Sequence, residues 1–188
     1  MKLPGRGFTP NVAGRPSREV IEVPSPPQLR VQLAQKGIAY TPLVRPGQDV
    51  SVGTALAQSE VNGGVVMLPS PASGSVGEIN LEKRFIGIDI TIDADDRTDS
   101  LFEPLKSQYA TSDQTRELIA KGGMWPEFYS SATQGMPMID GSEKPKTLIV
   151  NFVLAEPFHA RGRVVLTRSW DSVIEGIRFL PRLMDDYG

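Results

Sequence analysis

Short segments in which apolar and polar residues alternate recur through the first hundred residues of this 188-residue chain. Leu29–Leu33 (LRVQL) and Gly87–Asp93 (GIDITID) alternate most regularly, and the three isoleucines of the second segment fall on one face. A period of two residues is typical of half-buried β-strands, so each segment predicts one. A third apolar segment, Val20–Val23, predicts a short strand that ends at the prolines following it.

Glycine and proline separate these segments and predict the turns between them. Pro46–Gly47 indicates a turn, and Asn62–Gly63 is a strong two-residue hairpin signal because both residue types tolerate a positive φ. The segment Ser70–Ile79 (SPASGSVGEI) predicts a tight turn that leads into another strand. The chain has 18 glycines and 16 prolines, most of them in its first 80 residues or in loops, which predicts a β-rich front half.

The pattern changes period in the second half of the chain. Ser112 is a suitable N-cap for a helix that continues through Lys121, with Gly122 as its left-handed stop. Thr147–Leu154 (TLIVNFVL) is apolar almost throughout, which predicts a strand buried on both faces. A second helix follows, with a proline expected to kink or end it. Its apolar positions at helical spacing are Val173, Ile177, Leu180 and Met184, and the proline is Pro181.

The β-rich front half resembles the barrel-sandwich fold of biotinyl and lipoyl carrier domains. The resemblance rests on the pieces VRPGQDVSVGTALAQ and SPASGSVGEI, joined by a hairpin. In those carriers a lysine at the hairpin tip carries the cofactor on its long flexible stem. Here the tip is Val61–Gly64, and no lysine occurs between Lys36 and Lys83. We therefore interpret the module as a structural frame, and a biotin or lipoate blot tests the carrier alternative.

The predicted fold class is α+β, with a barrel-sandwich hybrid domain over residues 1–106 and a partial Rossmann-like α/β unit over residues 107–188. The second part contains one strand, one loop and one helix. One such unit cannot close a doubly wound sheet. It is therefore expected either to continue in further chain or to pack against something else.

Charge and composition narrow the range of functions. The 20 basic and 22 acidic residues give a net charge of −2, which argues against a nucleic-acid partner. The absence of cysteine excludes disulfides, thiolate metal sites and thiol nucleophiles. Because neither a signal-peptide core nor a run of 18 apolar residues occurs, we expect a chain that does not span a membrane and is not exported.

The sequence contains no strong catalytic or metal-binding pattern. Neither a G-x-S-x-G motif nor a P-loop occurs. The acidic segment 93–99 lacks the central glycine and terminal glutamate of an EF-hand loop, so we interpret it as a solvated strand end. His159, the single histidine, could act with Glu156 as an acid and base, but a surface or contact role is the favoured interpretation.

Segments along the whole chain resemble, in order, the A subunit of the Na+-translocating NADH:quinone reductase. The C subunit of the Rnf electron-transport complex is similar over the same modules. The order and spacing of the segments make the resemblance specific, above all GGMWPEF followed by the TLIVNF segment and its EP loop. The other segments include TPLVRPGQDVSVGTAL, SPASGSVGEIN, GIDITID and VIEGIRFLPRL.

The resemblance implies a cytoplasmic subunit, peripheral on the inner membrane, with the membrane-embedded subunits of a redox complex as partners. Such A subunits hold no covalent flavin or metal of their own and have been linked to quinone binding. They are more than twice this length, which implies a fragment or a short relative. The more distant flavoprotein subunit of respiratory complex I holds flavin and nicotinamide on a glycine-rich loop. Gly122–Pro126 lacks the further glycines of that loop, which argues against both ligands here.

One aromatic and methionine-rich segment is a candidate binding surface. Residues 124–138 are punctuated by glycine and are long for a plain connection. The side chains could form an adaptable apolar surface for a partner or a quinone ring, although ordinary core packing is the favoured interpretation. Together with the loop histidine, the candidate residues are Met124, Trp125, Phe128, Tyr129, Met136, Met138 and His159.

Three functions follow from these observations. The preferred one is a non-catalytic docking subunit of a membrane-associated NADH:quinone reductase-like complex, with no catalytic residues, no metal and no resident cofactor. The second is an electron-transfer module of an oxidoreductase that binds a non-covalent quinone or a flavin. The third is a short relative recruited as a structural subunit of another membrane complex. No activity is expected of the chain alone, and if the family role holds the chain is part of an NADH:quinone oxidoreductase-type complex.

Overall fold

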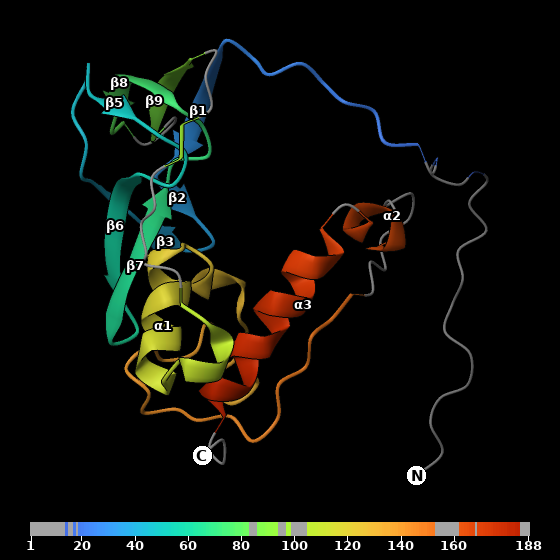
Figure 1. Cartoon of the computed structure of the whole chain (residues 1–188). Helices are drawn as coiled ribbons and strands as arrows, with labels where there is room; N and C mark the ends of the chain where they lie inside the picture. The colour runs from blue at the N-terminus through green and yellow to red at the C-terminus, as the bar shows by residue number, and fades with distance from the viewer. Residues whose placement is uncertain are drawn as a thin grey trace.

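The structure is a computed structural model. It describes residues 14, 17, 19–82, 86–93, 97–98, 105–152, 162–167 and 169–184. Strands lie at one end of the molecule and helices at the other, with β6 and β7 reaching toward the helices (Figure 1). All paired strands are antiparallel. The fold class is therefore α+β, as the sequence predicts.

One sheet contains four strands in the order β1-β9-β8-β5. These strands are β1 (Gln28–Gln32), β9 (Gly87–Ile92), β8 (Gly74–Asn80) and β5 (Asp49–Val50). The predicted strands at residues 29–33 and 87–93 are thereby confirmed, with small shifts at their ends, and β8 is the strand predicted to follow the turn in residues 70–79. Ile88 and Ile90 of β9 are fully buried, because the alternating pattern turns their side chains to the inner face.

The second sheet contains three strands in the order β4-β6-β7. They are β4 (Thr41–Pro42), β6 (Ala55–Val61) and β7 (Gly64–Pro69), and β2 (Ala34–Gln35) forms a separate hairpin with β3 (Ile38–Ala39). The predicted hairpin between β6 and β7 is confirmed. Its two turn residues have φ angles of 47° and 76°, the left-handed values that asparagine and glycine tolerate.

Helices occupy the second half of the chain and begin and end at local signals. Helix α1 (Ser112–Lys121) has Thr111 as its N-cap, in a capping box with Gln114, whereas the sequence suggested Ser112. The left-handed glycine is Gly123, with φ 72°, one residue beyond the predicted stop. The other helices are η1 (Ser107–Tyr109), η2 (Trp125–Glu127), α2 (Gly162–Leu166), α3 (Trp170–Phe179) and η3 (Leu180–Leu183).

The position of Gly123 has a tertiary cause. A Cβ atom there would lie 2.7 Å from Cδ of Pro69 and 2.9 Å from the carbonyl oxygen of Met67. The end of α1 thus packs directly against the backbone of β7, and only a residue without a side chain allows that approach. The second predicted helix, α3, is confirmed, and the chain passes into the 3₁₀ turn η3 at Leu180–Pro181.

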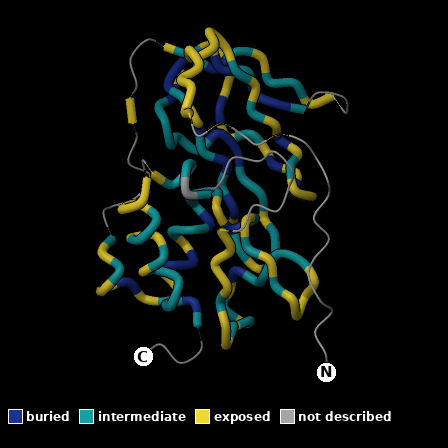
Figure 2. The backbone as a smooth tube through the Cα atoms, turned by 90° about the vertical axis from the view of Figure 1, so that its right-hand side faces the viewer, coloured by how far each residue is buried: buried dark blue, intermediate teal, exposed yellow. Residues whose placement is uncertain are grey.

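A single cluster of buried residues joins the sheets to the helices. It includes Leu56 and Val66 from the three-stranded sheet, Ile90 from the four-stranded sheet, and Ala120 of α1. Figure 2 shows buried stretches both among the strands and among the helices. Within the described part of the chain, no helix has the length and apolar character that a membrane crossing requires.

Two predicted strands are absent. Val20–Val23 forms no strand, and its valines are exposed. Residues 147–152 of the predicted strand Thr147–Leu154 also form no strand, and the last two positions lie outside the described residues. A strand needs a neighbour for its backbone N–H and C=O groups, and no described strand runs beside either segment. The predicted βα unit therefore lacks its strand over residues 147–152, and the Rossmann-like arrangement is not confirmed.

Candidate functional site

The structure places the predicted site residues in different environments. Phe128 and Tyr129 line a cavity of about 460 Å³. Trp125 is buried, with 3% of its surface exposed, whereas Met124 is 56% exposed and does not line the cavity. His159 lies outside the described residues.

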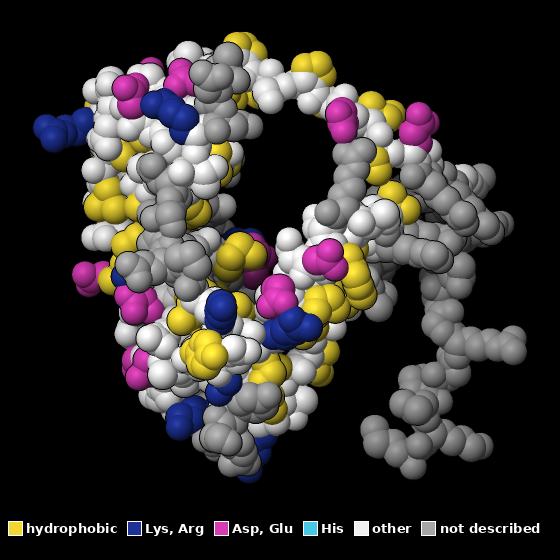
Figure 3. Space-filling model, in the orientation of Figure 1, with side chains coloured by type: hydrophobic (Ala, Val, Ile, Leu, Met, Phe, Trp, Pro, Cys, Tyr) yellow, Lys and Arg dark blue, Asp and Glu magenta, His cyan; other side chains and the backbone are white. Residues whose placement is uncertain are grey.

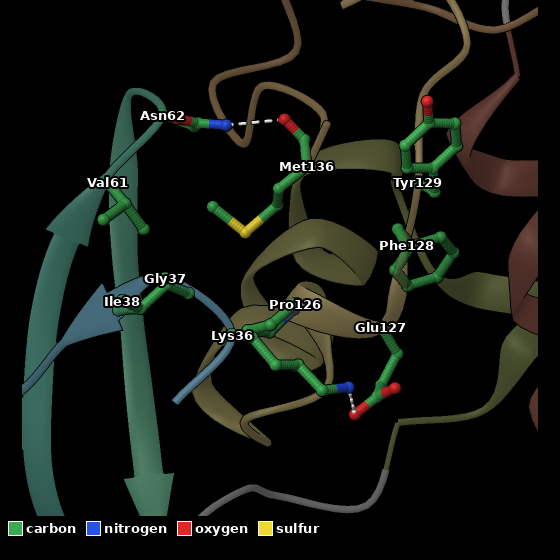
Figure 4. A pocket seen from close by; sticks show the side chains of 10 residues that line it. All are labelled: Lys36, Gly37, Ile38, Val61, Asn62, Pro126, Glu127, Phe128, Tyr129 and Met136. Carbon is green, nitrogen blue, oxygen red and sulfur yellow. Dashed lines mark hydrogen bonds and ion pairs between the residues drawn. The ribbon is translucent and has the colours of Figure 1, made fainter. Parts of the chain in front are cut away.

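The cavity lies where three parts of the fold meet (Figure 4). The β2–β3 turn forms one side, the end of β6 a second, and η2 with the loop after it a third. Its lining combines apolar side chains with polar and charged ones in comparable proportion. The lining consists of Lys36, Gly37, Ile38, Val61, Asn62, Pro126, Glu127, Phe128, Tyr129 and Met136.

Trp125 is buried beside the cavity and contacts Phe128, which lines it. Its indole Nε1–H donates a hydrogen bond to the carbonyl oxygen of Pro137 at 3.0 Å. Its ring centroid lies 5.5 Å from that of Phe128, in a tilted arrangement. The core interpretation is therefore correct for Trp125, and this buried side chain positions the phenyl ring that lines the cavity.

An ion pair connects two sides of the cavity. Lys36 and Gly37 form the β2–β3 turn with φ angles of 52° and 76°, and the Lys36 ammonium pairs with the carboxylate of Glu127 in η2. Both side chains remain about half exposed. Such a pair contributes only about 0 to 1 kcal/mol, because water solvates both charges well when they are apart.

The loop at residues 136–140 covers the tip of the β6–β7 hairpin. In carrier domains this tip is the position of the cofactor-bearing lysine. The Asn62 side-chain amide donates to the carbonyl oxygen of Met136 at 2.6 Å, and the Asn62 carbonyl accepts from the Ile139 N–H at 2.8 Å. A Cβ at Gly64 would lie 2.5 Å from Cγ2 of Ile139. The tip is thus fastened to the rest of the protein.

The covering loop continues into a region of opposite charges beside α1. The Ser142 hydroxyl and N–H donate to the Asp140 carboxylate at 2.6 and 2.9 Å, and these bonds lower the pKa of Asp140. Nearby Arg116 lowers that pKa further through its positive charge. Arg116 is itself buried and bonds Asp113 of the same helix at 3.0 Å. A Cβ atom at Gly141 would lie 3.0 Å from Cζ of Arg116, so the loop runs close to α1 here.

The cavity residues form an arrangement suited to binding. Neither a nucleophile paired with a base nor an acid–base pair of carboxylates lines it. In the described ranges, no group of three histidine, cysteine, aspartate or glutamate side chains could hold a metal ion. Apolar side chains beside the Lys36–Glu127 ion pair can contact a ring that carries an oxygen acceptor.

Exposed apolar side chains that do not line the cavity occur in the segment 149–152 and at the start of α3. Ile149 is 86% exposed, Val150 and Phe152 are each 43% exposed, and Trp170 is 52% exposed. Figure 3 shows hydrophobic side chains on the α3 side of the molecule, bordered by charged ones. We call these four residues the apolar surface.

Comparison with known proteins identifies relatives along most of the chain. The chain is similar to the A subunit of the Na+-translocating NADH-quinone reductase. The proteins of that name from Histophilus somni strains 129Pt and 2336 are 26% and 25% identical over 183 residues, which is 95% of this chain and 40% of each relative. The protein of that name from Mannheimia succiniciproducens is 26% identical over 143 residues. No protein-family model matches the chain.

The predicted resemblance to the A subunit is thereby confirmed. The chain spans about 40% of the length of the curated relatives from Histophilus somni. The similar stretch runs through both the strands and the helices, so it includes the parts of the chain that form the cavity and the apolar surface.

Part of the cavity can be predicted from the sequence. Phe128, Tyr129 and Met136 belong to a cluster of aromatic and methionine residues, which favours a binding surface. Lys36 and Glu127 carry no such signal, because their pairing depends on two segments that are 91 positions apart in the chain (127 − 36). A lysine-glycine turn between two short strands was the one local signal, and it does not indicate what the lysine side chain contacts.

Proposed function

We propose that the chain is a non-catalytic docking subunit of a membrane-associated redox complex of the NADH:quinone reductase type, peripheral on the cytoplasmic side of the inner membrane. Similarity to the A subunit over 95% of the chain carries this proposal. The two antiparallel sheets then serve as a barrel-sandwich hybrid frame. The hairpin tip supports this structural role, because it is hydrogen-bonded to the loop at residues 136–140 and has no lysine that could carry a mobile cofactor.

The apolar surface is the part of the chain that we assign to docking. Ile149 and Phe152 come from a segment that forms no strand, and Trp170 begins a helix in which no residue is buried. Exposed apolar side chains favour interaction sites, because contact with a partner removes them from water. The membrane-embedded subunits of a redox complex are the proposed partners.

Affinity purification from native membranes tests this proposal. We expect the tagged chain to retain the membrane-embedded reductase subunits, identified by mass spectrometry, and the variant Ile149→Ser/Phe152→Ser to lose them. Leu81→Ser is the matched control, because Leu81 is also exposed but follows β8 in the strand-rich part. Retention by the double variant would contradict the docking role. Recovery of an unrelated membrane complex would support recruitment of the chain into another assembly.

The cavity supports a second candidate function, the binding of a quinone as part of an electron-transfer module. Its volume of about 460 Å³ and its walls of Ile38, Val61 and Phe128 suit a flat apolar ring. A quinone added to the Trp170→Phe variant should quench the fluorescence of Trp125, which would then be the single tryptophan. Unsaturable quenching would contradict this function, and a flavin absorption band in the purified chain would favour a flavin instead.

A further inference from the structure

A groove separate from the cavity lies between the edge of β7 and helix α1. β7 is the outermost strand of its sheet, in the order β4-β6-β7, and α1 packs beside it (Figure 1). The groove has a volume of about 320 Å³, and its apolar lining comes from Val65, Ala120 and Ile139. None of the described residues lines both this groove and the cavity. We call it the β7 groove.

The peptide groups of Val65 face the open edge of β7. Val61 and Gly64 flank the two-residue turn of the hairpin, and this first pair is hydrogen-bonded. In an antiparallel ladder the next pair is not hydrogen-bonded, so Glu60 and Val65 direct their N–H and C=O groups away from each other. The N–H and C=O of Val65 therefore point out of the sheet.

Contacts on either side of Val65 leave a gap along the strand edge. Ile139 covers the preceding Gly64, where a Cβ atom would lie 2.5 Å from Cγ2 of Ile139. The carbonyl oxygen of Met67 would lie 2.9 Å from a Cβ atom at Gly123, just beyond α1. Positions 65 and 66 lie between these two contacts. An extended segment that enters the groove can therefore pair with the strand edge at Val65.

Arg116 provides a second donor that lacks an acceptor. Its side chain is 7% exposed and lines the groove, and Nη1 donates to the Asp113 carboxylate at 3.0 Å. Nη2 is buried and has no hydrogen-bond partner in the part of the chain that the structure describes. A buried N–H without an acceptor is costly, so an acceptor that reaches it is favoured. Turning the guanidinium toward the groove costs Nη2 no existing hydrogen bond.

The charges that line the groove favour a basic ligand over an acidic one. Two cations, Arg116 and Lys121, stand against three carboxylates, which gives 2 − 3 = −1. The cations pair with the carboxylates of Asp113 and Glu117. This pairing leaves Asp140 as the carboxylate that can meet the cation of a ligand.

We propose that the β7 groove binds an extended, basic segment of another polypeptide. The backbone of the segment adds to the edge of β7 at Val65, and one of its carbonyl oxygens accepts the unsatisfied N–H of Arg116. An apolar side chain of the segment contacts Ile139, and a lysine or arginine beside it meets Asp140. This site involves neither the cavity nor the apolar surface, and it goes beyond both functions proposed above.

NMR titration of the isotope-labelled chain with short peptides tests the proposal. The probes are acetyl-Leu-Lys-Leu-Lys-amide, its acidic counterpart acetyl-Leu-Glu-Leu-Glu-amide, and the basic peptide with N-methylated leucines. We expect the basic peptide to shift the amide signal of Val65 and the guanidinium signals of Arg116. It should bind about three- to tenfold more tightly than the acidic peptide. N-methylation removes backbone donors and should weaken binding by about two- to tenfold.

Hydrogen exchange separates pairing at the strand edge from general attraction. The Val65 N–H faces away from β6, so it should exchange quickly in the chain alone and at least about twofold more slowly with saturating basic peptide. The matched control is the N–H of Val66, which points toward Ser59 of β6. Its exchange rate should stay the same when the peptide is added.

Substitutions test the two polar contacts separately. Asp140→Asn keeps an oxygen that can accept from Ser142 but removes the charge, so it should weaken the basic peptide alone, by about two- to fivefold. Asp49→Asn is the matched control, because Asp49 is an exposed carboxylate of β5 outside the groove. Arg116→Lys keeps the charge but loses the guanidinium donors, and it should weaken both peptides by about two- to tenfold.

Each part of the proposal has its own refutation. Saturable binding of the basic peptide that leaves the Val65 exchange rate unchanged would overturn pairing at the strand edge. Equal affinities for the basic and acidic peptides, unaltered by Asp140→Asn, would overturn the basic partner. Absence of saturable binding by the basic peptide, in the parent chain that still unfolds cooperatively, would overturn the whole proposal. The quinone titration and the membrane purification depend on other residues, so they would keep their own outcomes.

Discussion

Replacing Gly64 by alanine tests whether the loop at residues 136–140 is fastened to the tip of the β6–β7 hairpin. The added methyl group would lie 2.5 Å from Cγ2 and 2.7 Å from Cβ of Ile139. These atoms belong to the stiff, branched part of a buried side chain, so a small rotation cannot relieve the overlap. Either the strand end or the loop must move.

The size of the effect follows from these contacts. Overpacking of this kind costs about 1 to 3 kcal/mol of the free energy of unfolding. If the loop moved away to avoid the overlap, it would lose its hydrogen bonds to Asn62, each worth about 0.5 to 1.5 kcal/mol. The loss of free energy of unfolding would then be of similar size. For a chain of this length, 1 kcal/mol corresponds to about 2 to 4 °C. The expected fall in Tm is thus roughly 2 to 12 °C.

Thermal unfolding followed by circular dichroism measures this change. Gly176→Ala is the matched control, because no atom lies within 4 Å of a Cβ at this position in α3. Alanine there should raise stability by roughly 0.5 to 1 kcal/mol, since glycine is a poor helix former. A Gly64→Ala variant with unchanged or higher Tm would refute the close packing of loop and hairpin. Because Met136 belongs to the same loop, Gly64→Ala should also weaken quinone binding.

Three further predictions concern other contacts. Asn62→Gly keeps a residue that tolerates φ 47° but loses the side-chain amide. The free energy of unfolding, measured in urea, should therefore fall by about 1 to 2 kcal/mol, and an unchanged value would argue against the hydrogen bond to Met136. Arg30 lowers the pKa of Asp89 below its ordinary 3.8 through bonds of 2.5 and 2.7 Å. The ionised Asp89 therefore stabilises the fold above pH 3.8, and this stabilisation is lost as pH falls through the lowered pKa. The difference in free energy of unfolding between the parent chain and Asp89→Asn should disappear over the same pH range, and a difference independent of pH would contradict the role of the ion pair. Thr111→Ala removes the capping box of α1 and should cost about 0.5 to 2 kcal/mol in chemical denaturation, with no loss expected if the box is not formed.

The sequence by itself determined the elements whose signals are local. It predicts the Asn62–Gly63 turn, the alternating segment that forms β9 and the periodic segment that forms α3. The sequence also shows that the tip of the β6–β7 hairpin contains no lysine. Each of these features depends on backbone preferences or on periodicity within a few residues, so the local pattern of residues is enough to indicate it.

Only the tertiary structure decided which distant segments meet. The apolar residues 147–152 predicted a buried strand, but hydrophobicity does not supply the neighbouring strand that pairs with their backbone. Gly123, rather than Gly122, became left-handed because it is the residue that touches β7. The cavity likewise joins Lys36 to Glu127, and this contact exists because the β2–β3 turn and η2 pack side by side, a proximity that no short-range pattern encodes.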